Sequence, residues 1–589
     1  LGIVIFFWKL GSTGLVDETP PLFAAAAREM GITGDYLTPR VNGLPRFDKP
    51  PLVYWFMSLF YSIPGNSTWD PLGSWSARLP SAISSLTIMI FLGDTVMKWP
   101  DKNELFPRRN GIITSLAFAI SPLVLIWSRT AVSDALLCST IGITLLLQWR
   151  QYVNPIPKYW IYSWIVLGLA VLTKGPIALV IVFLTNSLFS FYQKDFFLLF
   201  SRLNPIGGLC ITALICTPWY LFELFVEGKP FWDSFFGYHN FQRFTSVVNS
   251  HNQPWWFFVM ILIISSLPFT PLLILSIWQH CIDFFRSRNE FKYKRHQSLV
   301  AFSFCWLIAV LSFFTFSSTK LPSYWLPATP AAAILIASSA NYLNVIQKNK
   351  NFAWICCVLI NFIIAIVLFS LPLWAEYITD PQIPNLAEEL TKSKLVFRSA
   401  VIFAGAAFLG IVFFFRPIKG KLLLMQFPII CFHLFALIPV FSLADNLRQK
   451  PIRNIAQMVI ESKQQFEPLA MIGAKKPSLH FYTEKIVIYE DGTKQGLVNL
   501  SERMRLEERS GWEGNLIEDI NGSDTALVVI DSSTIDGSKY WQGLNPEILG
   551  KSGVYTLWRL NRFYLEEREK DLRSKGVSPN WSEPSMERF

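Results

Sequence analysis

Residues 48–61 read DKPPLVYWFMSLFY: an acid and a lysine, two prolines, and then a run of mostly aromatic and aliphatic side chains. A short apolar run at residues 1–10 precedes this stretch, and a series of long apolar runs follows it. Aromatic-rich helices of this kind lie at the level of the lipid headgroups. Ionisable groups at a membrane boundary are costly unless they are solvated, paired or used. Asp48 and Lys49 are therefore candidates for chemistry rather than packing.

The composition places the chain in a membrane. Of its 589 residues 52% are hydrophobic and only 16% are charged, whereas soluble proteins have about 25% charged residues. We therefore expect a polytopic α-helical membrane protein. The formal net charge of +10 is explained by short basic loops between spans, so no nucleic-acid partner is expected.

Apolar runs of about 17–25 residues predict about 13 membrane spans. They are expected at residues 1–10 (a partial span), 75–97, 111–127, 133–149, 159–172, 175–192, 205–223, 255–279, 298–317, 322–341, 352–372, 397–415 and 422–443. The first run has about half the residues that a crossing needs, so we expect a truncated first helix. Basic residues cluster in the connections after even-numbered spans, which are therefore cytoplasmic. The loop at 11–74 and the C-terminus then face outward.

Residues 444–589 differ from the membrane domain at 1–443. They contain no spanning run and none of the eight cysteines, so a disulfide framework there is excluded. Alternating and amphipathic patterns predict a small extracytoplasmic α/β domain. The expected strands are Leu469–Gly473, Ile486–Tyr489, Ala526–Asp531 and Tyr555–Leu560, and the expected helices are Ile452–Lys463 and Asn499–Arg509.

Two groups of charged residues in the first loop, Asp17-Glu18 and Lys49, each fit more than one role. The outward-facing pair Asp17-Glu18 can act as a general base, bind a metal or hold a substrate amine, or it is a solvated acid beside a helix start. Lys49 stands before Pro50-Pro51. A lysine at a helix N-terminus is an anion site, but it also fits a side chain that snorkels to lipid headgroups.

Further polar residues recur at the outward ends of the predicted spans: Arg129, Asp134, Lys174, His239, Arg243, His251, Lys320 and Tyr324. Each alone is also typical of an ordinary boundary position. Together, several cations and carboxylates on one side of the membrane suit an anionic substrate that is embedded in lipid. A lipid phosphate fits best, because its charge needs Lys or Arg at headgroup depth.

These motifs resemble a known family. They are Val16-Asp17-Glu18, Ala27-Arg28-Glu29-Met30, Gly34–Arg40, Asp48-Lys49-Pro50-Pro51-Leu52, Leu172–Pro176, His239–Phe244 and Thr319–Pro327. Over roughly residues 1–340 they resemble the lipid A aminoarabinose transferase family, which is related to the protein O-mannosyltransferases within the GT-C membrane glycosyltransferases. The chain departs from the family where His239-Asn240 stand in place of a frequent Glu-His, and where Asp48 occupies a position that is often Glu.

The resemblance implies an inverting transfer of a sugar from a polyprenyl (undecaprenyl) phosphate to a lipid A-like glycolipid or a protein. It implies no nucleotide cofactor. The implied residues are, for catalysis, Asp17, Glu18 and Asp134; for the donor phosphate, Lys49, Arg243, Lys320 and Tyr324; and for a divalent metal, Asp48 with His239 or His251. Asp17 would activate the acceptor, and Glu18 could pair with a cationic sugar.

The resemblance also implies a multi-pass protein of the bacterial inner membrane, with the active site and C-terminal domain in the periplasm. The sugar stays open between 4-amino-4-deoxyarabinose, mannose, galacturonic acid and others. The alternative is a transporter or lipid flippase, which predicts ionisable residues at mid-membrane on broken helices. A structural or binding membrane protein is the third hypothesis.

Overall fold

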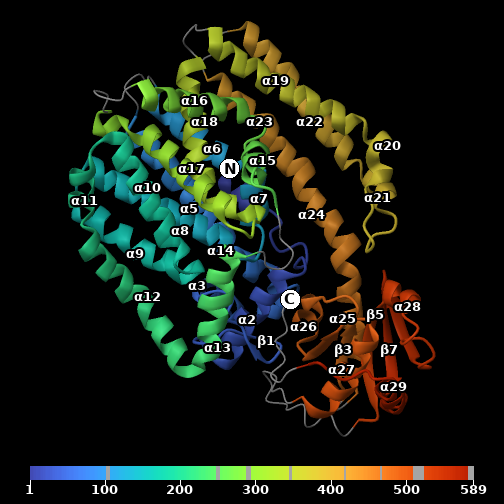
Figure 1. The fold of residues 1–589 in the computed structure, drawn as a ribbon. Coiled ribbons are helices and arrows are strands. Elements are labelled where there is room, and N and C mark those ends of the chain that lie inside the picture. The colour runs from blue at the N-terminus through green and yellow to red at the C-terminus, as the bar shows by residue number, and fades with distance from the viewer. Residues whose placement is uncertain are drawn as a thin grey trace.

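The computed structural model describes residues 1–100, 106–246, 253–286, 293–343, 348–416, 420–464, 467–507 and 523–581. Figure 1 shows a large helical body and, beside one end of it, a smaller part that contains a five-stranded sheet. One long helical segment, residues Lys421–Ser462, leads from the body into the smaller part. It runs through residue 444, where the change in composition begins.

The body is built from helices. Up to residue 203 they are α1 (Gly2–Phe7), α2 (Thr19–Thr33), α3 (Leu52–Tyr61), α4 (Asn66–Trp69), α5 (Ser74–Lys98), α6 (Pro107–Ala119), α7 (Pro122–Ser128), α8 (Asp134–Val153), α9 (Pro157–Lys174), α10 (Ile177–Gln193) and α11 (Phe196–Leu203). The next are α12 (Pro205–Glu227), α13 (Lys229–Phe231), η1 (Trp232–Gln242), α14 (Arg243–Thr245), α15 (Phe257–Ser265), α16 (Thr270–Arg286), η2 (Arg295–Gln297), α17 (Leu299–Phe316), η3 (Pro322–Ala328) and α18 (Thr329–Leu343). The last are α19 (Lys348–Phe369), α20 (Leu371–Trp374), η4 (Ala375–Tyr377), α21 (Leu386–Ser393), α22 (Leu395–Phe415), α23 (Lys421–Phe432), η5 (His433–Leu437), α24 (Ile438–Ala444) and η6 (Asp445–Gln449).

Six helical segments in the described residues are long and apolar enough to cross a membrane: Ser74–Lys98, Phe196–Glu227, Leu299–Phe316, Phe352–Phe369, Leu395–Phe415 and Lys421–Ser462. Two bent helix pairs, α6 with α7 at 66° and α15 with residues 270–284 of α16 at 120°, raise the number to eight. The predicted count of 13 is not confirmed. Apolar run length does not reveal where a helix breaks: the run predicted at 1–10 is the six-residue α1, and α10 has 17 residues.

The first loop contains α2 and α3, and α3 is the helix that the aromatic-rich stretch at residues 48–61 predicts. α2 has Pro20 and Pro21 in its first turn, where the missing N–H groups cost nothing. It ends at Gly34, whose φ of +75° suits glycine. α3 starts directly after Pro51, so the prolines fix the backbone that carries Asp48 and Lys49. Between the two helices lies a small hairpin of β1 (Arg40–Val41) and β2 (Leu44–Pro45).

The C-terminal part is a mixed sheet with helices. Its elements are α25 (Lys450–Ser462), β3 (Leu469–Ile472), α26 (Pro477–Thr483), β4 (Val487–Glu490), α27 (Lys494–Leu506), β5 (Thr525–Asp531), α28 (Ser532–Gly537), β6 (Glu547–Ser552), β7 (Tyr555–Asn561) and α29 (Arg562–Ser574). The strand order is β4-β3-β5-β7-β6. β3 pairs in parallel with β4 and β5, whereas β7 runs antiparallel to β5 and β6.

Side chains of the central strands alternate between two cores, as the two-residue period of a strand requires. In β3, Ala470 and Ile472 face one core, and Leu469 and Met471 face the other. The sequence predicts β3, β4, β5 and β7 to within two residues at each end. It misses β6, whose residues are half-buried or exposed and show no regular alternation.

The first loop of the body contacts the sheet part directly. The Asn42 side chain donates to the carbonyl oxygen of Val487 and accepts from its N–H, both at 2.8 Å. This side chain thus completes the pairing of β4, which is an edge strand. Arg28 forms an ion pair with Glu484 at 2.9 Å.

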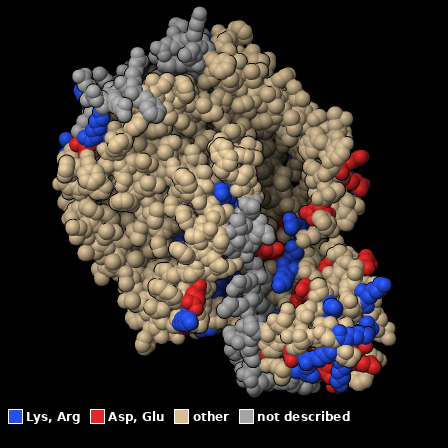
Figure 2. Space-filling view, in the orientation of Figure 1, with Lys and Arg blue, Asp and Glu red and all other residues tan. Residues whose placement is uncertain are grey.

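Charges are unevenly spread over the two parts. Figure 2 shows a visible face of the helical body that is almost free of Lys, Arg, Asp and Glu, whereas the C-terminal part is densely charged. Exposed phenylalanines such as Phe183 and Phe225, at 67% and 87%, belong to α10 and α12 of the body. A surface of this kind is suited to lipid.

Candidate active site

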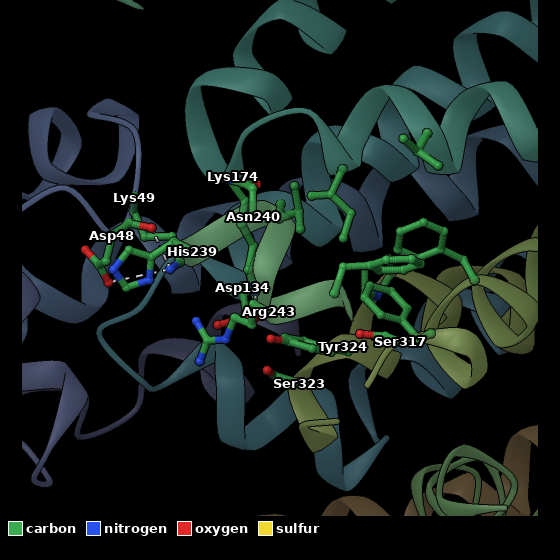
Figure 3. Close-up of a pocket in the computed structure, with 17 residues that line it drawn as sticks. Asp48, Lys49, Asp134, Lys174, His239, Asn240, Arg243, Ser317, Ser323 and Tyr324 are labelled. Carbon is green, nitrogen blue, oxygen red and sulfur yellow. Dashed lines mark hydrogen bonds and ion pairs between the residues drawn. The ribbon is translucent and has the colours of Figure 1, made fainter. Parts of the chain in front are cut away.

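A cavity of about 190 Å³ lies where the first loop, the start of α8, the end of α9, η1 and η3 converge. Its polar lining consists of Asp48, Lys49, Asp134, Lys174, His239, Asn240, Arg243, Ser317, Ser323 and Tyr324. Its apolar lining consists of Leu137, Ile177, Val180, Phe244, Phe313, Phe314 and Pro327. Figure 3 shows the labelled polar side chains gathered toward one part of the site, and unlabelled apolar sticks extending away from them.

Asp48 and Lys49 form the part of the cavity next to α3. The Lys49 ammonium donates to the Asp48 carbonyl oxygen at 2.8 Å and lies 3.5 Å from the carboxylate. The pKa of Lys49 falls to about 8, mainly because the group is buried, while Asp48 opposes the shift and the cations Arg243 and Lys174 add to it. Lys49 thus lies near one carboxylate and three other cations, Arg243, Lys174 and Arg46, and an anion bound among them would be stabilised.

Asp134 and Lys174 form a second charged pair. The Lys174 ammonium lies 2.6 Å from the Asp134 carboxylate and 5.1 Å from the ring centre of Tyr324. Asp134 is the first residue of α8 and Lys174 the last of α9. An acid at a helix N-terminus and a cation at a C-terminus are each favoured by the helix dipole. The fold therefore fixes both charges at the cavity wall.

His239, Asn240 and Arg243 come from η1, a π-helical segment, and from the residue that follows it. Burial, followed by the charge of Lys49, lowers the pKa of His239 to about 3, so the imidazole is neutral at physiological pH. In the described part of the chain, Arg243 Nε and His239 Nδ1 are buried and have no hydrogen-bond partner. Both atoms are therefore available to a ligand.

The cavity opens toward the lipid-facing surface at its apolar part. Val180 on α10 is 42% exposed and Phe244 is 39% exposed. Phe313 and Phe314, at the end of α17, complete this wall. An amphiphile with an anionic head and an apolar tail matches the two parts of the cavity.

Six of the predicted site residues line this cavity: Asp48, Lys49, Asp134, His239, Arg243 and Tyr324. Their assigned roles stay predictions. Lys174, which the sequence places among the polar residues at span ends without assigning it a role, also lines the cavity, whereas the lining residue Ser317 was not singled out.

Three predicted residues do not line the cavity. Lys320 is buried and donates to the carbonyl oxygen of Ser317 at 2.8 Å, so its charge is used on the backbone. Glu18 is exposed at the start of α2. Asp17 is the third. The predicted His251 lies outside the described residues.

Asp17 contacts the C-terminal part. Its carboxylate accepts from the backbone N–H of Ser478 at 2.9 Å and from the Ser478 hydroxyl at 2.5 Å. Burial raises the pKa of Asp17 to about 6, although both hydrogen bonds from Ser478 lower it. A pKa in this range suits a general base. The contact itself could not be predicted from a sequence pattern, because Ser478 lies 461 residues away along the chain.

Of the residues predicted for a metal, Asp48 is already engaged by other side chains, and His251 lies outside the described residues. The Asp48 carboxylate accepts from Arg46 at 2.7 Å and from the Tyr54 hydroxyl at 3.0 Å. Although burial raises the pKa of Asp48, the charges of Arg46 and Lys49 bring it below its ordinary value. Among the described residues, no three His, Cys, Asp or Glu side chains are grouped so that they could hold a metal ion.

Comparisons with known proteins agree with this architecture. Residues 48–222 match the family described as dolichyl-phosphate-mannose-protein mannosyltransferase, and residues 462–576 match the C-terminal domain of cyanobacterial RgtA-type glycosyltransferases. The whole fold is similar to the crystal structure of ArnT from Cupriavidus metallidurans bound to undecaprenyl phosphate. The TM-score is 0.74 at 20% identity, covering 95% of this chain and 96% of that one.

Two relatives are similar to this chain in sequence and differ in how much of their length the match covers. The undecaprenyl phosphate-alpha-4-amino-4-deoxy-L-arabinose arabinosyl transferase 2 of Proteus mirabilis is 27% identical over 346 residues, which is 57% of either chain. An uncharacterized protein of Aquifex aeolicus is 27% identical over 66% of this chain and 81% of its own length. The match therefore spans little more than half of the named transferase.

The helical body and the sheet-containing C-terminal part each contain a segment that is similar to glycosyltransferases. These segments are residues 48–222 in the body and residues 462–576 in the C-terminal part. The fold as a whole is similar to that of ArnT. The chain is therefore similar to glycosyltransferases in both of its parts.

Proposed function

We propose that this protein is an integral-membrane glycosyltransferase that moves a sugar from a polyprenyl-phosphate donor to an acceptor on the outer face, with inversion. The observation that carries the proposal is the two-part cavity, in which Lys49, Lys174 and Arg243 face apolar side chains that reach the lipid-exposed surface. The names of the relatives support undecaprenyl phosphate as the lipid and an aminopentose as the sugar.

The donor would lie with its phosphate among the cations and its isoprenoid tail along the aromatic wall. Lys49 and Arg243 would neutralise the phosphate, and the Tyr324 hydroxyl would donate to one of its oxygens. As the bond between the sugar and the phosphate oxygen breaks, negative charge grows on the leaving group. Fixed cations in a buried site stabilise that charge more in the transition state than in the ground state.

The acceptor hydroxyl attacks the anomeric carbon from the side opposite the phosphate, and its proton passes to a carboxylate. Two carboxylates are candidates for this step. Asp134 lines the cavity, but it is paired with Lys174. Asp17 lies outside it, but burial gives it a pKa of about 6. Substituting each carboxylate by asparagine distinguishes which of the two accepts the proton.

The proposed location is the bacterial inner membrane, with the cavity and the C-terminal part in the periplasm. Ser67 is an exposed residue of the first loop. A Ser67→Cys variant is expected to react with a membrane-impermeant maleimide in cells whose outer membrane has been permeabilised, beyond the labelling of the unmodified protein. Labelling only after the inner membrane is lysed would place the loop in the cytoplasm and refute the proposed orientation.

The activity is tested with purified protein, undecaprenyl-phosphate sugars with a radiolabelled sugar, and lipid A or a peptide as acceptor. Transfer is expected with wild type and is expected to fall at least 100-fold in Lys49→Ala. Lys392→Ala, which changes an exposed lysine of α21, is the matched control and should transfer normally. Equal activity of Lys49→Ala and wild type would refute the phosphate site.

A further inference from the structure

Arg46 occupies the position at Asp48 where a divalent cation would have to bind. Its guanidinium donates to Asp48 Oδ2 at 2.7 Å and lies 5.5 Å from the centre of the Phe23 ring. Its Nε lies 3.4 Å from the Tyr54 hydroxyl, and that hydroxyl donates to Asp48 Oδ1 at 3.0 Å. Both oxygens of the carboxylate are therefore engaged by side chains of the first loop.

The backbone fixes Arg46 in this place. Its N–H donates to the carbonyl oxygen of Pro39 at 2.7 Å, which closes the β1–β2 hairpin. Phe23 of α2 stacks on Tyr54 of α3, with ring centres 5.1 Å apart. The guanidinium therefore lies against a rigid aromatic pair, and a guanidinium stays charged at all physiological pH values.

A metal ion would need ligands that this arrangement does not offer. Figure 3 shows His239 beside Asp48 and Lys49, so the described part of the chain offers one imidazole and one carboxylate at this place and no group of three metal-binding side chains. Metal sites of proteins ordinarily use at least three protein ligands or a cluster of oxygen donors. Asp48 would also have to give up its bond to Arg46 to bind a metal.

We propose that Arg46 acts as a built-in cation in place of a divalent metal, so that transfer by this protein does not depend on a metal ion. The inference rests on the proposed function. Arg46 does not line the cavity, so it is a positioning residue that acts through Asp48. By neutralising this carboxylate, it leaves the charge of Lys49 for the donor phosphate. Without Arg46, the ammonium 3.5 Å away would pair with Asp48 instead.

The proposal makes the effect of chelators and metals the decisive readout. Wild type is expected to keep its transfer rate within twofold in EDTA and with added Mg²⁺, Mn²⁺ or Zn²⁺. Arg46→Ala is expected to fall at least tenfold both in EDTA and with each of these ions, because Lys49 then pairs with Asp48 and one carboxylate with one imidazole does not hold a metal. Arg46→Lys, which keeps a cation, should retain more activity than Arg46→Ala and show no metal response.

The matched control is Arg40→Ala, which removes an arginine of the same loop that pairs with Glu227. It should keep its transfer rate within twofold of wild type and show no metal response. Loss of wild-type transfer in EDTA with recovery on adding metal would overturn the proposal, as would an Arg46→Ala variant as active as wild type. Recovery of Arg46→Ala with one of these ions would contradict the argument that the remaining ligands are too few to bind a metal.

A binding measurement separates this proposal from the proposed function. Affinity for undecaprenyl phosphate, followed by intrinsic tryptophan fluorescence, is expected to be unchanged by EDTA in wild type and at least fivefold weaker in Arg46→Ala. If the binding results are as expected but wild type transfers no sugar, the proposed function is refuted and the role of Arg46 in binding is still supported. Chelator-sensitive binding in wild type would refute the role of Arg46 itself.

Discussion

Replacing Asp17 by asparagine tests whether this carboxylate is a base or only an anchor for the C-terminal part. Asparagine is nearly isosteric, and its side-chain oxygen can still accept from the Ser478 N–H, which lies 2.9 Å from the carboxylate in wild type. The substitution therefore removes the charge and the basicity but keeps the contact. If Asp17 is the base, transfer is expected to fall 100-fold or more, which is the usual size of general-base catalysis.

The same substitution should not unfold the protein. The pKa of Asp17 is raised from 3.8 to about 6, so the folded state favours the protonated acid. The stabilisation that this gives is full below pH 3.8 and is lost as the pH rises through about 6. At pH 7.5 the ionised carboxylate therefore costs about 3 kcal/mol, from two pKa units at about 1.4 kcal/mol each. Asp17→Asn should unfold at the same temperature as wild type or higher.

The pH profile gives a second, independent sign. A base with a pKa of about 6 loses activity below that pH, so wild-type transfer at pH 5 should be about a tenth of its plateau value. Hydrogen bonds from Ser478 lower the pKa of Asp17, so Ser478→Ala should move the acid limb to higher pH. The control is Ser67→Ala, which changes an exposed serine of the loop that carries Asp17. It should leave the acid limb of the pH profile in place.

The assay is transfer of a labelled sugar by protein of verified folding, with Asp134→Asn measured beside Asp17→Asn. Full activity of Asp17→Asn would refute a role as base and leave Asp134 as the candidate. A loss of both activity and thermal stability in Asp17→Asn would refute the reasoning from burial. An acid limb that does not move in Ser478→Ala would assign that limb to another group.

Three more predictions follow from the described contacts. Lys174→Met should lower the free energy of unfolding by about 3–5 kcal/mol, since it leaves Asp134 buried without its cation. Adding Asp134→Asn to this variant should restore part of the lost stability. If the changes in melting temperature of the two single variants simply added up in the double variant, the pairing would be contradicted. Asn42→Ala should cost about 2–3 kcal/mol by removing both bonds to Val487, and an unchanged melting temperature would contradict this. Affinity for undecaprenyl phosphate should fall above about pH 8 as Lys49 loses its proton, and Lys49→Arg should abolish that decline; a decline that persists in Lys49→Arg would belong to another group.

Local sequence determines part of the site. Asp48 and Lys49 reach the cavity because the prolines that follow them start α3 at a fixed point. Asp134 and Lys174 reach it because α8 and α9 run antiparallel, so that the start of α8 lies beside the end of α9. In each case the signal is a charge next to a helix boundary, and such boundaries can be recognised from proline, glycine and the limits of apolar runs.

Other features depend on packing between distant segments and could not be predicted. Asp17 contacts Ser478 only because the C-terminal part folds back on the first loop. Lys320 has the same sequence signal as Lys174, yet it turns onto the carbonyl of Ser317. The bends that reduce the number of spans lie between helices, for example the 66° bend that joins α6 to α7, and an apolar run has the same composition whether or not it bends.

The contacts of the first loop explain why such a membrane enzyme would carry a sheet domain. The loop holds Asp48 and Lys49 at the cavity, but it has only the small β1–β2 hairpin and the helices α2, α3 and α4 of its own. The C-terminal part also holds it: Ser478 binds Asp17 before α2, Glu484 pairs with Arg28 of α2, and Val487 pairs with Asn42 in the hairpin turn. Because Arg46 follows that turn by four residues, a displaced sheet would loosen the cation that orders Asp48. The domain would then support catalysis by fixing the loop, even without touching the donor.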